Sequence, residues 1–268
     1  MFQTHQLDNL IYLTSDVLGD GIRHGFSTRL GGVSTGALSS LNLRGYQHGD
    51  TRENVQENYR RFCAVLGVDA EKVVLTQQEH TDNIRVVTAE DAGKGLWRER
   101  DYQAIDGLIT DVPGMVLAVF GADCNVILLH DTVHHAVGAC HAGWRGTANG
   151  IVAKTVAAMT AHYGTDPVHV RAAIGPSIAQ CCFETDDDVP LALRQAFGEE
   201  AGNYMERRDA KWHIDLKGLN ALWLTRLGVS VDVCPLCTMC HPELFWSHRR
   251  MGNMRGVQGA MIAREEDV

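Results

Sequence analysis

The sequence predicts an α+β fold: a single layered domain, residues 1–268, in which mixed and antiparallel β-sheets are flanked by helices. Two short apolar runs in the middle of the chain, 126–129 and 136–140, are close enough to pair as an antiparallel hairpin. Elsewhere strand-like runs alternate with segments of helical periodicity, which favours a layered α+β domain over a purely parallel sheet. The chain has 268 residues, of which 45% are hydrophobic, and neither a repeat nor an obvious linker. We therefore expect one domain.

The helices are predicted from capping residues, apolar spacing and glycine stops. The segment 50–53 has the spacing of a capping box at the start of the first helix, and Gly67 ends the helical pattern. Thr147 is expected to cap a second helix, which carries apolar residues on one face and ends at Gly164. Further helices are expected at 189–197 and 216–227, and further strands at 73–75, 168–174 and 229–233.

The central hairpin brings two chemically active side chains together. If its turn lies around residues 131–134, Leu129 faces Ala136, and the same register places Cys124 opposite His141. Directly opposed residues of an antiparallel pair have Cα atoms about 4.5 to 5.5 Å apart. That distance allows a shared metal ion or a thiol–imidazole pair, although a buried cysteine beside a core histidine fits the same spacing.

A third potential ligand, His80, follows the strand predicted at 73–75 and therefore lies near a strand end. Two histidines and one thiolate with an open fourth position are typical of a catalytic zinc site, whereas structural zinc is normally closed by four protein ligands. The sequence thus predicts a metal site of His80, Cys124 and His141. Asp123 could orient one of these ligands from behind, or simply cap a strand end.

Arg145 lies between two glycines, Gly143 and Gly146, where a strand leads into a helix. Helix N-termini attract anions, so a phosphate could bind beside this guanidinium. The glycines could equally serve only a tight turn, with Arg145 paired to a surface carboxylate.

The acidic balance limits the classes of partner. The formal net charge of −9 argues against a general nucleic-acid or membrane-surface binder, although Arg249, Arg250 and Arg255 could form a local basic pocket. The first residues lack the pattern of a signal peptide, and no apolar run approaches the length of a membrane span. We expect a cytoplasmic protein whose eight cysteines are reduced.

Residues 237–241 match the C-x-x-C-H pattern of covalent haem attachment, but that assembly belongs to exported proteins. Cys234, Cys237, Cys240 and His241 could instead hold a structural zinc, yet their spacing offers no second ligand pair at the usual distance. We favour a loop of half-buried thiols.

The motifs together resemble those of the bacterial polyphenol-oxidase or laccase-domain family, also described as a purine nucleoside phosphorylase and peptidoglycan-editing-factor family. The resemblance covers nearly the whole chain. It departs from the family at Glu79, where an apolar residue is usual, and at Asn125-Val126, where Val-Pro is common. The matching segments are 24–29, 31–34, 40–43, 78–80, 122–124, 141–146, 174–176 and 247–250.

The resemblance implies a zinc-dependent phosphorylase that acts on adenosine, inosine and methylthioadenosine with phosphate and also deaminates adenosine. It implies zinc at His80, Cys124 and His141, with these residues and Asp123 forming the catalytic group. Substrate and phosphate contacts are expected from Arg29, Ser34, Asn42, Gln78, Arg145 and Arg255.

The family's oxidase name is not matched by the histidines. Coupled copper centres need many imidazoles, often as His-x-His pairs, and none of the 13 histidines forms such a pair. Copper could still displace zinc in vitro, because affinity rises toward Cu²⁺ among the divalent ions. Two alternative functions remain: a hydrolase or amidase of peptidoglycan precursors with Cys124 as nucleophile, and a non-catalytic nucleotide-binding protein.

Overall fold

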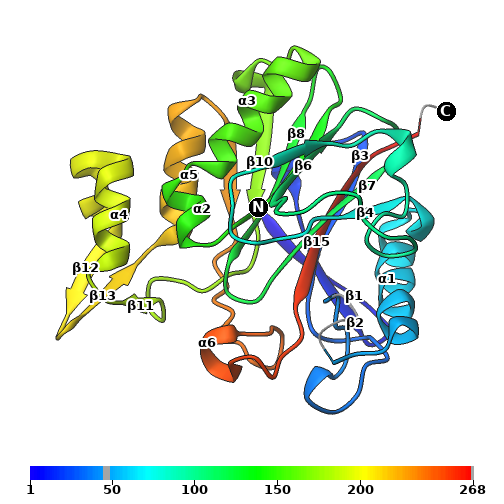
Figure 1. Cartoon of the computed structure of the whole chain (residues 1–268), viewed down its shortest axis with the longest axis horizontal. Coiled ribbons are helices and arrows are strands. Elements are labelled where there is room, and N and C mark those ends of the chain that lie inside the picture. The colour runs from blue at the N-terminus through cyan, green and yellow to red at the C-terminus, as the bar shows by residue number, and fades with distance from the viewer. Residues whose placement is uncertain (45–48, 267–268) are drawn as a thin grey trace.

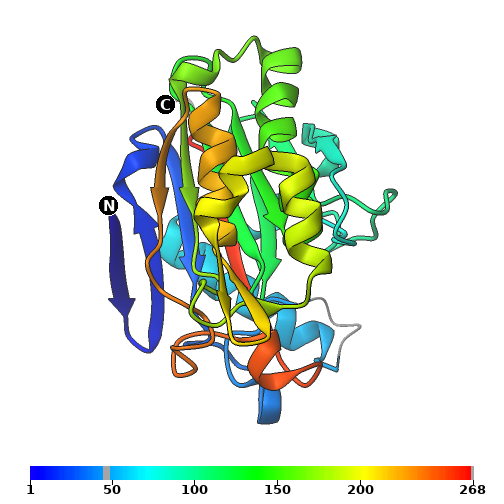
Figure 2. The same cartoon turned by 90° about the vertical axis from the view of Figure 1, so that its left-hand side faces the viewer.

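Two large β-sheets pack face to face, and helices cover their outer faces (Figures 1 and 2). This computed structural model describes residues 1–44 and 49–266. The layer between the sheets contains Phe26, Leu117 and Ile262 from the first sheet and Leu108 and Leu128 from the second, all almost fully buried. The arrangement confirms the predicted α+β class, with helix, sheet, sheet and helix as successive layers.

The first sheet has the order β1-β2-β3-β15-β7-β4. All its pairs are antiparallel except β4 with β7. Helix α1 (Arg52–Leu66) packs on its outer face through Tyr59 and Phe62. The strands are β1 (Phe2–Leu7), β2 (Leu10–Ser15), β3 (Ile22–Ser27), β4 (Val73–Leu75), β7 (Val116–Gly121) and β15 (Gln258–Arg264).

Helix α1 (Arg52–Leu66) lies between the capping-box segment and the glycine that its sequence indicates. The Thr51 side chain accepts a hydrogen bond from the Asn54 N–H, which satisfies one of the free donors of the first turn. Gly67 ends the helix in the left-handed conformation, at φ 69°, where a residue without Cβ is least strained. Local signals were sufficient for this helix.

The second sheet has the order β14-β10-β8-β9-β6-β5. The β10–β14 and β5–β6 pairs are parallel, and the remaining pairs are antiparallel. Helices α3 and α5 cover its outer face, with Met159 and Leu224 in the shared core. The elements are β5 (Ile84–Val86), β6 (Gly107–Thr110), β8 (Asn125–Asp131), β9 (Val137–Ala142), β10 (Val170–Ile174), β14 (Ser230–Val233), α3 (Ile151–Tyr163) and α5 (Leu216–Arg226).

A third, three-stranded sheet of order β11-β13-β12 lies beside α4 at one side of the molecule (Figure 1). Leu193, Phe197 and Ile214 form a small separate core there.

Among the described residues no helix is both long and apolar enough to cross a membrane. The elements are β11 (Glu184–Thr185), β12 (Met205–Arg208), β13 (Lys211–Ile214), α2 (Trp144–Ala148), α4 (Asp188–Phe197) and α6 (His248–Met251).

The predicted register of the central hairpin is wrong by two residues. Leu129 pairs with Gly138 rather than with Ala136, and His141 pairs with Val126 rather than with Cys124. The turn lies further along the chain than expected, because Asp131 ends the strand and its carboxylate accepts the N–H groups of the turn residues 133 and 134. Side chains alternate with a period of two, so this shift leaves each of them on its predicted face.

The helix predicted to begin at Thr147 is two helices. The short α2 starts after Gly143, and the chain breaks at Gly150, whose left-handed conformation (φ 72°) precedes α3. Thr147 is therefore not a cap. Its buried hydroxyl accepts a hydrogen bond from the Asn220 side chain at 2.9 Å, which ties α2 to α5. Arg145 lies within α2 and not before the N-terminus of the longer helix.

Candidate metal centre and active site

Three chain segments that lead to or follow the two large sheets supply the candidate ligands. His80 lies between β4 of the first sheet and β5 of the second. Cys124 lies between β7 of the first sheet and β8 of the second. His141 is near the end of β9, in the second sheet. The chain thus passes from one sheet to the other twice, and both crossings meet the end of β9.

The structure brings His80, Cys124 and His141 together. The Cys124 Sγ lies 3.8 Å from the His80 Nε2, and the two imidazole rings are 4.9 Å apart at 78°. One ligand atom from each residue lies within 4.8 Å of the others. His141 is buried, Cys124 is half-buried and His80 is exposed, so the group has a closed side and an open side. These three residues could hold a metal ion.

Asp106, directly before β6, supports two of these residues, and the sequence reasoning missed it. One carboxylate oxygen lies 2.8 Å from the His141 Nδ1, which leaves the Nε2 of that ring available to the site. The same carboxylate accepts the backbone N–H groups of Glu79, His80 and Thr81 at 2.9 to 3.2 Å. The fully buried Asp106 therefore fixes the ring of one histidine and the backbone of the other.

Two residues of the site have unusual backbone conformations. His80 has φ 60° and Asp123 has φ 85°, in the left-handed region that side chains with a Cβ seldom occupy. The Asp106 carboxylate compensates for the conformation of His80, because it binds three successive N–H groups around it. Strained conformations of this kind cluster at functional sites.

The charges of the group favour a thiolate beside an imidazolium. Burial opposes ionisation of Cys124, but the charge of His141 and hydrogen bonds from His141 and His80 outweigh it and lower the pKa of the thiol to about 6. Burial likewise opposes protonation of His141, but the Cys124 thiolate and the Asp106 carboxylate raise its pKa to about 9. A deprotonated thiolate is the form that binds a metal or acts as a nucleophile.

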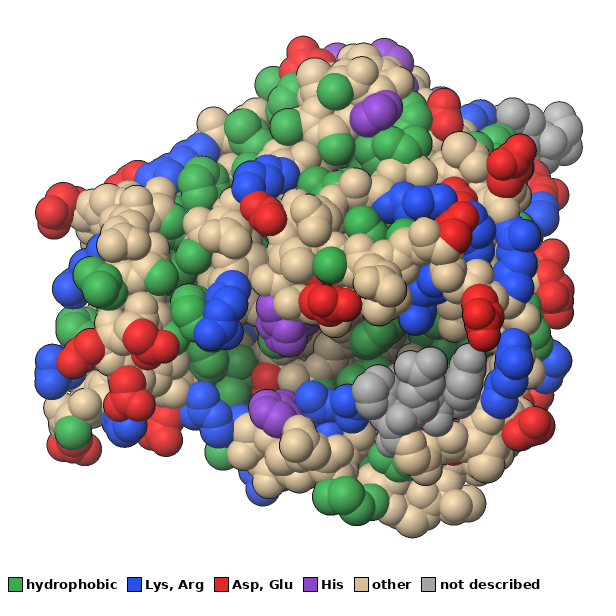
Figure 3. All heavy atoms as spheres, in the orientation of Figure 1, with side chains coloured by type: hydrophobic (Ala, Val, Ile, Leu, Met, Phe, Trp, Pro, Cys, Tyr) green, Lys and Arg blue, Asp and Glu red, His purple; other side chains and the backbone are tan. Residues whose placement is uncertain are grey.

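The group opens into a pocket of about 300 Å³. Trp144 and Arg145 of α2 form part of the wall, and the Arg145 guanidinium stacks on the Trp144 ring at 4.1 Å. Figure 3 shows a depression in the middle of this face, with histidine and Lys or Arg side chains on its borders. Ile178, Phe183 and Leu216 add an apolar part to the wall.

Of the residues expected to contact substrate, Arg145 lines this pocket and Arg29 does not. The Arg29 guanidinium donates to the carbonyl oxygens of Pro242 and Ser39, both at 3.0 Å, and stacks on Trp246 at 4.0 Å. Arg29 therefore joins the N-terminal glycine loop to the segment before α6.

Ser34, Asn42 and Gln78 also make internal contacts. Ser34 and Asn42 donate to the same oxygen of Asp50, at 2.6 and 2.8 Å, and both are buried. The Gln78 side chain amide pairs with the backbone N–H and carbonyl of Phe120 at 2.9 and 2.7 Å. These contacts connect the loops around the site, and none of the three residues is among those that line the pocket.

Arg255 has a different environment. Its Nε and Nη1 are buried, and neither has a hydrogen-bond partner among the described residues. Burial lowers the pKa of Arg255, with the charge of Arg44 acting in the same direction and those of Asp123 and Cys124 opposing it. A buried guanidinium with free donors close to the thiol is suited to an anion.

Asp123 lines the pocket, and its carboxylate binds the loop before α6 and the start of that helix. It accepts hydrogen bonds from the Thr238 and Ser247 hydroxyls, at 2.6 and 3.1 Å, and from the Arg249 N–H at 2.6 Å. The carboxylate in contact with a candidate ligand is that of Asp106, so a ligand-orienting role for Asp123 stays a prediction.

Comparisons with known proteins identify the family to which the chain belongs. The family model described as "Multi-copper polyphenol oxidoreductase laccase" matches residues 23–265. The purine nucleoside phosphorylase YlmD of Geobacillus stearothermophilus is 37% identical over 251 residues, 91% of this chain and 90% of the relative. Its crystal structure superposes with a TM-score of 0.90 at 35% identity and covers 99% of both chains.

Two other relatives carry informative names. The mouse purine nucleoside phosphorylase LACC1 is 33% identical over 267 residues, 96% of this chain, which spans 59% of the relative's length. The adenosine deaminase RL5 of an unknown prokaryotic organism is 34% identical over 234 residues, 85% of this chain and 88% of the relative. With the family model covering most of its length and several relatives above 30% identity, the chain belongs to the multi-copper polyphenol oxidoreductase laccase family.

Proposed function

We propose that residues 1–268 act as one catalytic domain, a metal-dependent purine nucleoside phosphorylase that also deaminates adenosine. The observation that carries the proposal is the group of His80, Cys124 and His141, of which His80 and Cys124 line a pocket large enough for a small molecule. The names of the relatives, purine nucleoside phosphorylase in several and adenosine deaminase in one, support the same substrate class. Adenosine, inosine and methylthioadenosine are the proposed nucleosides.

The donor set fits zinc. A thiolate and two imidazoles are ligands that zinc accepts, and three protein ligands leave the fourth position open. Asp106 binds the Nδ1 of His141, so this ring would use its Nε2. A bound zinc would supply Lewis acidity toward a substrate oxygen or toward water. Copper fits the same nitrogen and sulfur donors and could replace zinc in vitro.

Phosphorolysis forms a bond between a phosphate oxygen and the ribose anomeric carbon and breaks the bond from that carbon to the purine nitrogen. The chain must therefore hold a dianion beside a neutral nucleoside. Arg145 in the pocket wall and the buried Arg255 with its free donors are the proposed phosphate ligands. Ile178, Phe183 and Leu216 provide an apolar wall for the base. Fixing both reactants in this way removes much of the entropic cost of their encounter.

The same pocket without phosphate admits water to the purine. Attack at C6 with loss of ammonia converts adenosine to inosine, which is the deamination that we propose as a second activity. Both reactions need His80 and His141 to keep their orientation, and Asp106 provides it for both. The presence or absence of phosphate would then select between the two products.

A cysteine hydrolase is the second candidate, and one observation favours it. Cys124, His141 and Asp106 are arranged in the order nucleophile, base and orienting carboxylate, and the pKa of the thiol is lowered. An amidase acting on peptidoglycan precursors would use this arrangement. It would not need His80, which contacts the same sulfur from the open side. A non-catalytic nucleotide-binding protein would not need the arrangement of Cys124, His141 and Asp106.

Metal content and product identity separate these functions. Protein purified without added metal is analysed for zinc, copper and iron, and is then incubated with adenosine in the presence and absence of phosphate. We expect substitution of Cys124 to remove about one zinc ion per chain. We expect adenine as the product when phosphate is present and inosine as the product when it is absent. Activity that survives a chelator and is abolished by alkylation of Cys124 would instead identify the cysteine hydrolase. No turnover of nucleosides or peptidoglycan precursors would favour the binding protein.

A further inference from the structure

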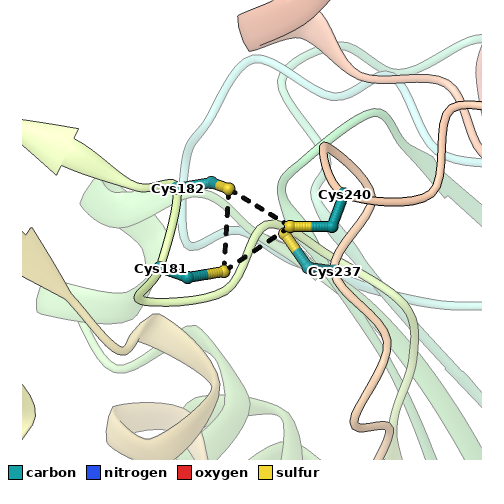
Figure 4. A group of neighbouring side chains, drawn as sticks. All are labelled: Cys181, Cys182, Cys237 and Cys240. Carbon is teal, nitrogen blue, oxygen red and sulfur yellow. Dashed lines mark hydrogen bonds between the residues drawn. The ribbon is translucent and has the colours of Figure 1, made fainter.

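Four cysteines from two loops that are far apart in the sequence lie together in one group (Figure 4). Cys181 and Cys182 lie in the turn between β10 and β11, and Cys237 and Cys240 lie in the loop between β14 and α6. The two loops run side by side, joined by a bridge between Ser177 and Cys237. The sequence reasoning considered Cys237 and Cys240 with Cys234 and His241, and the structure supplies the second pair of thiols from the other loop.

The spacing of the sulfur atoms is that of a metal site. The Cys182 and Cys240 sulfurs are 3.4 Å apart, Cys181 and Cys182 3.6 Å, and Cys181 and Cys240 3.8 Å. Four thiolates at about 2.3 Å from a zinc ion in tetrahedral geometry are about 3.8 Å from one another. A disulfide would need about 2.05 Å. Three of the sulfurs thus have nearly the spacing of a tetrahedral site, and all four lie within 4.8 Å of one another.

A backbone N–H group and an ammonium lie close to the second cysteine pair. The Ala179 N–H points to the Cys237 Sγ at 3.3 Å. Lys217 donates to the carbonyl oxygens of Cys234 and Leu236, and so holds an ammonium under the loop. Four thiolates around a divalent cation leave a net charge of −2, which such nearby cations and N–H dipoles offset.

The two loops also form part of the pocket. Ile178 and Phe183, on either side of the first cysteine pair, line it. Thr238, inside the second pair, donates its hydroxyl to Asp123, next to Cys124. A link between the loops would therefore hold the pocket wall at a fixed distance from the candidate metal ligands.

We propose that Cys181, Cys182, Cys237 and Cys240 bind one zinc ion in a closed four-thiolate site, separate from the group of His80, Cys124 and His141. Soft thiolates select zinc over the hard cations magnesium and calcium. Four protein ligands close the coordination sphere, so this ion is structural. It joins the loop after β10 to the loop after β14.

The test counts metal at each site independently. Zinc per chain is measured by elemental analysis after purification under reducing conditions, for the full chain and for two double variants. We expect two zinc ions in the wild type, one in Cys181→Ser/Cys240→Ser and one in His80→Ala/Cys124→Ser. Cys234→Ser, which removes a buried thiol of the same loop outside the group, is the matched control and should keep both ions.

Cobalt substitution covers the case in which the cysteine variant does not fold. The His80→Ala/Cys124→Ser protein, in which all four thiols remain, should bind one Co²⁺ with the intense thiolate charge-transfer absorption of a tetrahedral sulfur site. Failure of this folded variant to bind either Zn²⁺ or Co²⁺ would overturn the proposal. A disulfide between the two loops that persists through purification under reducing conditions would also overturn it. Because the variant lacks the other ligands, the outcome does not depend on the proposed phosphorylase activity.

Discussion

Single residues determine what the candidate active site can do, and Asp106 is the clearest case. It has no sequence motif of its own beyond an Asp-Gly pair before an apolar run. Only the pairing of β6 with β9, in which Gly107 is opposite Cys140, brings its carboxylate to His141. Metal-binding histidines usually donate their second ring nitrogen to such a group, and its loss typically lowers metal affinity or activity about 10- to 100-fold.

Asp106→Asn should therefore weaken metal binding and nucleoside turnover by about 10- to 100-fold while the fold is retained. The amide still accepts one N–H from the His80 segment but no longer carries the charge that raises the pKa of His141. Asp131→Asn is the control, since this buried carboxylate also contacts a histidine, His134 at 2.9 Å, far from the pocket. Equal metal affinity in wild type and Asp106→Asn, by competition with a chelator, would refute the role.

His24 predicts how stability depends on pH. Its Nε2 accepts the Ser15 N–H at 2.9 Å, and burial lowers its pKa from 6.5 to about 4. Well above pH 6.5 the His24 ring is neutral in both the folded and the unfolded chain. As the pH falls from 6.5 to 4, the unfolded chain binds a proton that the folded chain does not, so the free energy of unfolding decreases.

Urea denaturation at pH 7 and pH 5 measures this effect. The free energy of unfolding of the wild type should be lower at pH 5 than at pH 7. The decrease should be smaller for His24→Gln, whose side chain cannot take up the proton. His162→Gln, at the exposed end of α3, is the comparison and should behave like wild type. A His24→Gln protein with the same pH dependence as wild type would exclude the buried ring as the cause.

At the scale of elements, the segments that pass between the sheets decide the site, and the sequence predicts them only in part. Helix α1 and the existence of β8 and β9 follow from local patterns, which short-range caps and apolar spacing determine. The register of the β8–β9 hairpin does not follow from these local patterns, because the hydrogen bonds of the Asp131 side chain move the turn. The sequence pattern also does not predict the break between α2 and α3 at Gly150, since a single glycine is tolerated within many helices.

Convergence of the site is likewise only partly predictable. Cys124 and His141 were expected together, and the two-residue error in register preserved their common face. His80 was placed near a strand end, but nothing local indicates that this end meets β9. The loop that carries Cys181 and Cys182 gave no signal of its contact with Cys237. Such long-range contacts depend on sheet order, which the sequence pattern alone does not specify.

Gly143, at the junction of β9 and α2, tests how closely the segments pack. A Cβ at this position would lie 2.7 Å from the His80 Cδ2 and 3.2 Å from the Cys124 Sγ. Its φ of −70° suits any residue, so Gly143→Ala should disturb the ligands without straining the backbone. We expect loss of the metal at this group and of activity, measured on the same preparation.

Gly202→Ala is the matched control, because a Cβ there meets nothing within 4 Å. It should keep metal and activity at the wild-type level. If Gly143→Ala retains both as well, the imidazole of His80 does not lie where the structure has it.

At the scale of the whole molecule, the sandwich of two sheets is the platform that holds the three segments. The core between the sheets is continuous, and residues from both sheets contribute to it. Its integrity should therefore limit the stability of the site as well as of the fold.

Leu117→Ala tests the core. The side chain is fully buried between the sheets, and its truncation should lower the free energy of unfolding by about 2 to 5 kcal/mol. Leu191→Ala, on a helix at a position that is 60% exposed, should change it by less than about 0.5 kcal/mol. Similar denaturation midpoints for the two variants would contradict the assignment of the main core to the space between the sheets.

We propose that His80, Cys124 and His141 share one metal ion at the pocket. An X-ray anomalous difference map of the crystallised protein, recorded at the zinc edge, would locate that ion. We expect a peak about 2.3 Å from the Cys124 Sγ and about 2.0 to 2.1 Å from a nitrogen of each imidazole. Crystals of protein that turns over adenosine, with no peak between these three side chains, would contradict it.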